Sequence, residues 1–374
     1  MSADARFQSR PTRAVVDLSA LARNYRRLRE RAGRIAVFPV VKSDAYGHGA
    51  VAVARRLEEE GADRFAVASA EEGIALRRGG VRGQILILGF SDSRDAAVWR
   101  NYGLIPSLYD IAQARAIASA VGNGSERQPV HLKLDTGMGR LGISPGELAD
   151  MIALLRQSPA LELAGTFTQL ARAQEPGSPA TDRQIETMRG CLVALSAGGL
   201  DPGLVHVANS AAVLLHPSSL FQAFRPGLAL YGVLPSEEID VNGWEPVMTV
   251  ETAAMSVRRV PAGMPLGYGG IFVTRRASTI AVLPIGYDDG LRRSLSGRVS
   301  VLLRGQEAPL VGAVSMNLTL VDATGCGAEI GDRVVVLGSD SRHRVTAWDL
   351  ARAAGTIPYE ILCGFGGRLP RSYV

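Results

Sequence analysis

Apolar runs alternate with helical patterns along most of the chain, and this alternation restricts the possible fold more than any other feature. Eight of the runs have the length and composition of strands. These runs are Val37–Lys42, Arg64–Ser69, Gln84–Gly89, Leu104–Tyr109, Val130–Asp135, Leu163–Gln169, Leu204–Asn209 and Phe224–Gly232. They are continuously apolar, which is typical of strands that are buried on both faces.

Helical patterns fill the intervals between these runs, after a first helical pattern that carries Leu21, Tyr25 and Leu28 on one face. The later ones are Ala50–Glu60, Ala70–Arg78, Arg94–Arg100, Ile111–Ala120, Pro145–Arg156, Asp182–Ala197 and a short Ser210–Leu215. This repeated order predicts an α/β fold, a closed (β/α)8 barrel of the TIM type. An open doubly wound sheet is the alternative, but no GxGxxG motif follows an early strand.

Beyond Trp244 the chain changes character. Four segments there are short, β-branched and bounded by glycine or proline, namely Met248–Val257, Thr279–Pro284, Val299–Leu303 and Val334–Leu337. This pattern predicts a mainly antiparallel β domain, followed by a helix at Ala347–Ala354. We therefore predict a barrel at residues 12–242 and a β domain at residues 243–374 together with residues 1–11.

Composition excludes several classes of protein. The net charge of +5 arises from 41 basic and 36 acidic residues that are scattered along the chain, so a nucleic-acid surface is not indicated. This balance suits an anionic ligand better. No segment approaches the ~18 consecutive apolar residues of a membrane span, and the amino terminus has no signal peptide pattern. The cysteines, Cys191, Cys326 and Cys363, are far apart and lack metal-ligand spacing, which predicts a reducing, cytoplasmic location and no metal site.

Polar residues gather where the predicted barrel strands end. Barrel enzymes carry their active sites at the carboxyl ends of the strands, so this clustering predicts a site there. The residues are Lys42, Lys133, Asp135, Arg140, Gln169, His206, Asn209, Ser210, Arg225, Gly227 and Leu228.

Lys42 is the central residue of this set. A lysine at the rim of a buried strand can be partly desolvated, which lowers its pKa and frees the amine for Schiff-base chemistry. Ser210 and the backbone amides near Gly227 offer donors for a phosphate group after strands seven and eight. A lysine opposite a phosphate site is the arrangement that binds pyridoxal phosphate. The alternative is an ordinary strand that ends in a snorkelling lysine.

Arg225 is the best candidate for a partner to the cofactor's ring nitrogen. A guanidinium donates hydrogen bonds but keeps its proton, so the ring would be a weak electron sink, and this favours racemisation over transamination. Racemisation needs one base on each face of Cα. Lys42 can serve one face, and Tyr268, isolated in a glycine loop, is the candidate for the other. A phenol has an ordinary pKa of about 10, so Tyr268 can act as a base only with positive charge nearby. The alternative interpretations are a surface ion pair for Arg225 and an ordinary loop aromatic for Tyr268.

Seven motifs resemble, in order, the signatures of the alanine racemase family. They are Val40–Gly49, Lys133–Gly142, His206–Ser210, Arg225–Gly232, Ile285–Gly290, Gly331–Gly338 and Thr356–Leu362. The resemblance implies a fold-type III pyridoxal phosphate enzyme, with a barrel and a β domain, that pairs head to tail as a homodimer. Its substrate would be a small amino acid, interconverted between L- and D-alanine.

The resemblance also implies roles for single residues. Lys42 would carry the cofactor and act as the base for the D-enantiomer, and Tyr268 would be the base for the L-enantiomer in the other subunit's active site. The residues around the phosphate would be Tyr46, Ser210, Gly227, Leu228 and Tyr359, with Arg225 facing the ring nitrogen. Those around the substrate carboxylate would be Arg140 and the backbone amide of Met316, with Lys133, often carbamylated in the family, steadying Arg140. Tyr287 would narrow the substrate entrance.

The sequence departs from the family pattern at three positions. Gln169 stands where the family usually has a histidine that connects the catalytic tyrosine to the ring-nitrogen arginine, so the control of the acidity of Tyr268 is in doubt. Asn317 stands where an aspartate usually follows the methionine, which could relax substrate choice. Gly267 stands where serine is common, and we expect it to be tolerated.

Four alternatives stay open at this point. Racemisation of serine or of a broader set of amino acids is the nearest, and the bulk of Tyr359 argues against it. A fold-type III decarboxylase would present a carboxylate rather than Arg225 to the ring nitrogen. A non-enzymatic pyridoxal phosphate-binding protein of the homeostasis type would have a barrel alone. The last alternative is a catalytically weakened paralogue, which Gln169 keeps open.

Overall fold

The computed structural model describes residues 10–122, 127–340 and 342–374. The described chain divides into two compact units. One contains Leu21–Ala45 and Ala50–Glu245, and we call it the barrel unit. The other contains residues 10–20, Tyr46–Gly49 and Pro246–Val374, and we call it the β unit.

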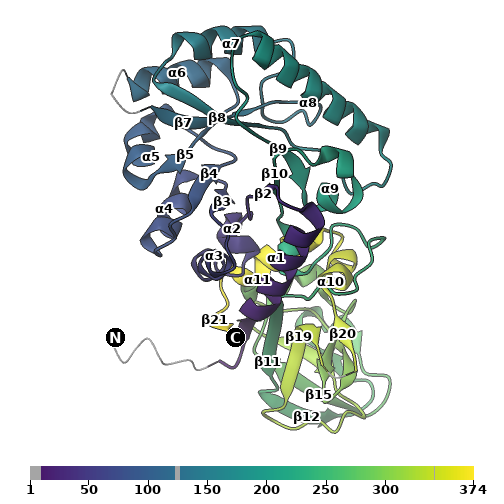
Figure 1. The fold of residues 1–374 in the computed structure, drawn as a ribbon. Helices are drawn as coiled ribbons and strands as arrows, with labels where there is room; N and C mark the ends of the chain where they lie inside the picture. Colours follow the sequence, from purple (N-terminus) through teal and green to yellow (C-terminus); the bar gives the residue numbers. More distant parts are fainter. Residues whose placement is uncertain (1–9, 123–126, 341) are drawn as a thin grey trace. The chain divides into compact units, whose positions relative to one another are not determined.

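The barrel unit is built on parallel strands (Figure 1). They are β2 (Ala36–Val37), β3 (Arg64–Val67), β4 (Gln84–Ile87), β5 (Leu104–Ile105), β6 (Ser107–Leu108), β7 (Gln128–Lys133), β8 (Leu161–Phe167), β9 (Leu204–Asn209) and β10 (Ala223–Arg225). β5 and β6 are halves of one strand, interrupted at Pro106, which has no N–H to donate.

The order of the strands closes the barrel. Six strands follow one another as β2-β10-β9-β8-β7-β6, and three as β3-β4-β5. A parallel bridge between Val40 and Ala66 joins the chain after β2 to β3. Within the described residues the ring therefore has eight parallel strands, which confirms the predicted (β/α)8 barrel.

Helices follow the strands and cover them on the outside (Figure 1). They are α1 (Leu18–Ala32), α3 (Ala50–Glu59), α4 (Ala70–Arg78), α5 (Ala96–Tyr102), α6 (Ile111–Val121), α7 (Leu148–Gln157), α8 (Pro179–Ala197) and α9 (Ser210–Leu215). Short 3-10 helices lie among them, namely η2 (Ser93–Asp95), η3 (Pro217–Ser219) and η4 (Leu228–Tyr231). Each helix turns an apolar face inward, as α6 does with Ala114, Ile117 and Val121.

Two predicted strands are shorter than expected. The run Phe224–Gly232 is strand only in β10, because η4 follows it after Gly227. The first run leaves the sheet after Val40, and Lys42 begins the short element α2 (Lys42–Tyr46). Burial makes both runs apolar, so the composition alone could not distinguish strand from buried turn.

The β unit contains a ten-stranded sheet in which most neighbours are antiparallel. Its strands are β1 (Arg13–Val16), β11 (Met248–Ala253), β12 (Ser256–Val260), β15 (Ser278–Leu283), β16 (Ser300–Leu303), β17 (Gln306–Val311), β18 (Thr319–Asp322), β19 (Arg333–Ser339), β20 (Arg344–Val345) and β21 (Arg371–Tyr373). A separate hairpin joins β13 (Pro265–Leu266) to β14 (Phe272–Val273).

The remaining elements of the β unit are short helices. They are η5 (Tyr268–Gly270), η6 (Tyr287–Asp289), η7 (Arg293–Leu295), α10 (Ala347–Ala354) and α11 (Pro358–Gly366). α10 begins at a capping box in which Thr346 and Asp349 satisfy each other's backbone N–H groups, as its sequence favours.

The start of the chain belongs to the β sheet. β1 pairs antiparallel with β11 and parallel with β21, so residues 13–16 lie in the β unit, whereas we predicted that the barrel begins at residue 12. The division after Glu245 lies three residues beyond the predicted boundary at 242. None of the helices that the structure describes is long and apolar enough to cross a membrane.

Candidate active site

Lys42 begins a left-handed turn rather than ending a strand. Ser43, Asp44, Ala45 and Tyr46 have φ values of 53°, 51°, 55° and 54°. Each such residue costs roughly 1–2 kcal/mol relative to right-handed backbone, and strain of this kind persists where the surroundings enforce it, often at functional sites.

Hydrogen bonds hold this turn in place. The Ala45 N–H donates to the Val41 carbonyl at 2.9 Å. The Ser43 N–H donates to the Glu72 carboxylate at 2.7 Å, and the Asp44 carboxylate accepts from the Ala50 N–H at 2.7 Å. The backbone that carries Lys42 is therefore fixed from both sides.

Arg225 is buried at the end of β10, with only 3% of its surface exposed. Its guanidinium donates to the carbonyls of Thr168 and His206, each at 2.6 Å, and to the side-chain oxygen of Gln169 at 3.4 Å. It also donates to Nδ1 of His206 at 2.7 Å. Burial lowers the pKa of Arg225 to about 9, so the group stays charged at neutral pH.

A second histidine continues this network. Because a guanidinium only donates, Nδ1 of His206 must be an acceptor. The imidazole proton of His206 must therefore be on Nε2. That nitrogen lies 2.8 Å from Nδ1 of His131, which must accept in turn. Burial, followed by the charge of Arg225, lowers the pKa of His131 to about 3 and that of His206 well below its ordinary value. Both rings are therefore neutral, and the tautomer of each is set by Arg225.

Lys133 ends β7 on the same strand as His131. It is 6% exposed, donates to the Leu88 carbonyl at 3.3 Å and lies 5.6 Å from the centre of the Phe167 ring. Burial, followed by the positive charges of Arg140, Arg225 and Lys42, lowers its pKa to about 8. This lysine can therefore lose its proton near physiological pH.

Arg140 lies on an exposed loop that follows β7 and is held by hydrogen bonds to residues at the end of that strand. The loop is closed at its base by hydrogen bonds of Ile143 with Lys133 and Asp135. Inside it, the Asp135 carboxylate accepts from the N–H groups of Gly137, Met138 and Gly139 at 2.8–3.1 Å. Burial raises the pKa of Asp135, but these hydrogen bonds outweigh it and the net shift is downward. Asp135 thus folds the segment that presents Arg140.

Ser210 begins α9 and faces the turn that contains Gly227. Its hydroxyl accepts from the Gly227 N–H at 2.8 Å and from the Ala229 N–H at 3.3 Å. The side chain of Asn209 caps α9 by accepting from the Ala212 N–H. The structure therefore brings Ser210, Gly227 and Leu228 together after the last two barrel strands.

Other predicted residues lie in the β unit. Tyr46 and Tyr359 are neighbours there, with ring centres 5.9 Å apart, and burial raises the pKa of Tyr359. Tyr287 and Met316 are also brought together, because the Tyr287 N–H donates to the Ser315 carbonyl at 3.0 Å and the next N–H donates to the Met316 carbonyl. Asn317 is exposed beside Met316.

Tyr268 lies on the exposed loop between β13 and β14. Its side chain is 74% exposed, and Gly267, Gly269 and Gly270 all have positive φ. The ends of the hairpin are anchored, because Leu266 belongs to the buried cluster of the β unit and Phe272 packs against it. The loop is held at its base while its tyrosine is largely exposed to solvent.

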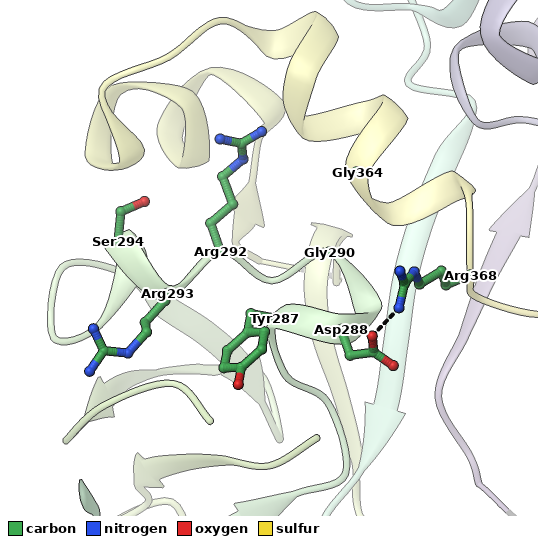
Figure 2. A pocket seen from close by; sticks show the side chains of 8 residues that line it. All are labelled: Tyr287, Asp288, Gly290, Arg292, Arg293, Ser294, Gly364 and Arg368. Carbon is green, nitrogen blue, oxygen red and sulfur yellow. Dashed lines mark hydrogen bonds and ion pairs between the residues drawn. The ribbon is translucent and has the colours of Figure 1, made fainter. Parts of the chain in front are cut away.

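A cavity of about 700 Å³ in the β unit adjoins Tyr287 (Figure 2). Three arginines line it, Arg292, Arg293 and Arg368, and their side chains point in different directions. Arg368 pairs with Asp288, and Arg292 pairs with Glu360 outside the residues drawn. Sequence reasoning missed these arginines, although Arg292 and Arg293 follow the Ile285–Gly290 motif after a single residue, Leu291.

The network also contains residues that sequence reasoning did not select. His131 lies two residues before Lys133 on β7, so the two side chains share one face of the strand, and the inward direction of His131 could have been predicted from the position of Lys133. Thr168, whose carbonyl accepts from Arg225, and Gln184, whose amide donates to the Gln169 carbonyl at 3.0 Å, carried no sequence signal. Among the described residues, no group of three or more histidines, cysteines or acids is placed to hold a metal ion.

Comparisons with known proteins agree with this architecture. Residues 16–235 match the family model "Alanine racemase, N-terminal domain", and residues 247–373 match "Alanine racemase, C-terminal domain". The alanine racemase of Symbiobacterium thermophilum is 40% identical over 369 residues, which covers 97% of each chain. That of Syntrophobacter fumaroxidans is 42% identical over 362 residues and 96% of each chain.

Solved structures are similar over nearly the whole chain. The alanine racemase from D-cycloserine-producing Streptomyces lavendulae gives a TM-score of 0.93 at 36% identity and covers 98% of each chain. The Bacillus anthracis alanine racemase with bound L-Ala-P gives 0.93 at 34% identity and covers 98% of this chain and 96% of that one. The predicted family and its racemase class are confirmed. This chain belongs to the alanine racemase family.

Proposed function

We propose that the protein is a pyridoxal phosphate-dependent alanine racemase that acts as a homodimer and interconverts L- and D-alanine with two bases. One observation carries the proposal. The chain contains only two lysines among its 41 basic residues, Lys42 and Lys133; Lys133 is the last residue of β7, and Lys42 lies after β2 and its bridge at Val40, on the same side of the barrel strands.

The residues of the barrel suit the cofactor's chemical groups. Lys42 offers an amine for its aldehyde. The Ser210 hydroxyl, which accepts from the Gly227 N–H and keeps its own proton to donate, and the backbone N–H of Leu228 offer donors for its phosphate, with Tyr46 and Tyr359 as further hydroxyls. Arg225 offers a buried cation whose described hydrogen-bond acceptors are all uncharged, so a ring nitrogen is a fitting further acceptor.

When bound, pyridoxal phosphate supplies an electron-accepting ring that acidifies the Cα proton of an attached amino acid. Nζ of Lys42 takes or returns this proton on one face of Cα. Oη of Tyr268 from a second subunit does so on the other face. The guanidinium of Arg225 donates a hydrogen bond without releasing its proton, which limits the stabilisation of negative charge on the ring.

The substrate's carboxylate is bound by Arg140 and by the backbone N–H of Met316. Lys133, with its lowered pKa, supports Arg140 and is a candidate for carbamylation, because only a neutral amine can react with carbon dioxide. His206 and Asn209 fix Arg225 and α9 from behind. Tyr287 narrows the entrance. The 74% exposure of Tyr268 within one chain supports its use by a second subunit.

A broader racemase is the second candidate. Asn317 is exposed beside Met316, where the family usually has an aspartate, and Gln169 contacts Arg225 without a titratable group. Chiral analysis of all twenty amino acids after incubation with the enzyme separates the two candidates. We also propose a reducing, cytoplasmic location, which the wide separation of the cysteines and the burial of Cys191 and Cys326 support.

Borohydride reduction of the cofactor-loaded protein tests the proposal. With only two lysines in the chain, a reduced adduct can form at Lys42, at Lys133 or at the terminal amine. We expect peptide mass analysis to find one adduct per chain, on Lys42, together with racemisation of alanine before reduction. An adduct on Lys133, or no racemisation, would refute the assignment.

A further inference from the structure

Gln184 is a buried amide on α8 that reaches two of the loops at the mouth of the barrel. Only 4% of its surface is exposed. Its side-chain oxygen accepts from the Ala171 N–H at 2.8 Å. Its nitrogen donates to the Gln169 carbonyl at 3.0 Å and to the Thr136 hydroxyl at 3.3 Å.

These contacts connect the loop of Arg140 to the segment beside Arg225. Thr136 lies in the loop that follows β7, and its hydroxyl is 2.8 Å from the hydroxyl of Thr168. Thr168 in turn accepts from Arg225 through its carbonyl. Gln184 therefore spans both strand-end segments with one rigid carboxamide.

The fit around this side chain is close. A Cβ placed on Gly137 would lie 3.3 Å from Cγ of Gln184, so the loop backbone runs directly over the amide. Three hydrogen bonds and this contact fix the Gln184 side chain. Any other rotamer would leave a buried amide without hydrogen-bond partners, at the full free-energy cost of its desolvation.

We propose that Gln184 is a positioning residue that sets the place of Arg140 relative to Arg225, and hence the affinity for the substrate's carboxylate. This proposal rests on the proposed function. It requires no contact of Gln184 with substrate. The hydrogen bonds of Gln184 within the described part of the chain go to Ala171, Gln169 and Thr136, so its loss acts on those segments rather than on the turn of Lys42.

Gln184→Met tests the proposal, because methionine keeps the volume and removes all three hydrogen bonds. We expect KM for both enantiomers of alanine, and the inhibition constant of propionate as a plain carboxylate probe, to rise about 10-fold, while kcat changes less than about 3-fold. Thr136→Val should give part of the same effect, and less than additively when combined with Gln184→Met.

Gln113→Met is the matched control. Gln113 on α6 makes an equivalent set of bonds, accepting from the Tyr109 N–H and donating to the carbonyls of Ser91 and Ser107, at strand ends that carry none of the proposed substrate residues. It should lower thermal stability and leave KM and propionate binding unchanged.

The outcomes separate the two proposals. A wild-type protein without racemase activity rejects the proposed function. If the wild type is active and folded Gln184→Met has unchanged KM and propionate binding, the positioning role of Gln184 is rejected. An equal effect of Gln113→Met rejects it too. If Gln184→Met does not fold, Gln184→Glu replaces it in the test, since glutamate retains the acceptor for the Ala171 N–H and loses both donors. Unchanged KM and propionate binding in that variant likewise reject the positioning role of Gln184.

Discussion

The barrel mouth and the Tyr268 loop are built in opposite ways. At the barrel mouth, Arg225 is 3% exposed and its neighbours fix it through at least four acceptors. In the β unit, Tyr268 is 74% exposed on a loop with three glycines of positive φ. The barrel mouth encloses its arginine with residues of its own chain, whereas the loop leaves its tyrosine open to solvent. This contrast supports the proposal that Tyr268 acts at the site of a second subunit.

The largest effect should come from Lys42, on the enclosed side of this comparison. Lys42→Ala removes both the cofactor's amine and one of the two bases, so we expect racemisation in both directions to fall by at least about 10⁴-fold. Chiral chromatography of the product measures it, together with loss of the yellow colour of the bound cofactor. A rate within 10-fold of wild type, or retention of the colour, would contradict the role of Lys42.

Tyr268→Phe probes the exposed side. It removes a single hydroxyl from a solvent-facing loop, so folding should be unaffected while proton removal from L-alanine falls about 10²–10⁴-fold, more than removal from D-alanine. Exchange of the Cα proton in deuterated water, followed for each enantiomer separately, measures this asymmetry. Equal losses for both enantiomers would contradict the two-base assignment.

Gln169→His tests in the same assay whether the histidine that is missing at this position changes the pH dependence of the exchange rate.

The histidine pair sharpens the comparison through acid stability. The folded pKa of His131 is about 3 and that of His206 is also lowered, so between about pH 3 and 6.5 the unfolded chain binds more protons than the folded one. The free energy of unfolding should therefore decrease as pH falls through this range, by about 1.4 kcal/mol per pH unit from His131, and His206 acts in the same direction. Urea unfolding at pH 7 and 5 measures it, and His131→Asn should show a shallower decrease. An equal slope in the variant would mean that His131 is not held neutral.

The smallest expected effect concerns Lys133. Its folded pKa of about 8 lies below the ordinary value of 10.5, so burial of the charged amine opposes folding below pH 8 and this penalty disappears as pH rises from about 8 to 10.5. Isotopic reductive methylation of the cofactor-free protein gives one signal for each of the two lysines. We expect the Lys133 signal, identified by its absence in Lys133→Met, to titrate near pH 8. Titration near 10.5 would show that the amine is solvated.

The sequence predicted the barrel well because one physical rule, continuous apolar runs between amphipathic helices, repeats along the chain. It selected Lys42 but placed it at the end of a strand, and it did not predict the left-handed turn that follows, since Ser43, Asp44 and Ala45 carry no glycine signal for positive φ. The run after Arg225 was also misjudged, because a buried 3-10 turn and a buried strand share the same composition.

The candidate site divides in the same way. Residues inside motifs, such as Arg140 and Ser210, were predicted because their chemistry is visible in the sequence. Gln184 was not predicted, because its contacts with two loops arise only in the folded structure and a glutamine on a helix carries no signal of them in the sequence. The roles of the motif residues stay predictions until they are tested.

Subunit complementation tests the central claim most directly. We expect the Lys42→Ala and Tyr268→Phe variants each to be nearly inactive. In the proposed homodimer, a mixed dimer formed by subunit exchange would have one site with both an intact Lys42 and an intact Tyr268. If the two residues meet across subunits, an equimolar mixture should recover about one quarter of wild-type activity, because half of the dimers are mixed and each has one complete site. Activity that stays at the level of the separate variants after verified exchange would contradict a site shared between two chains.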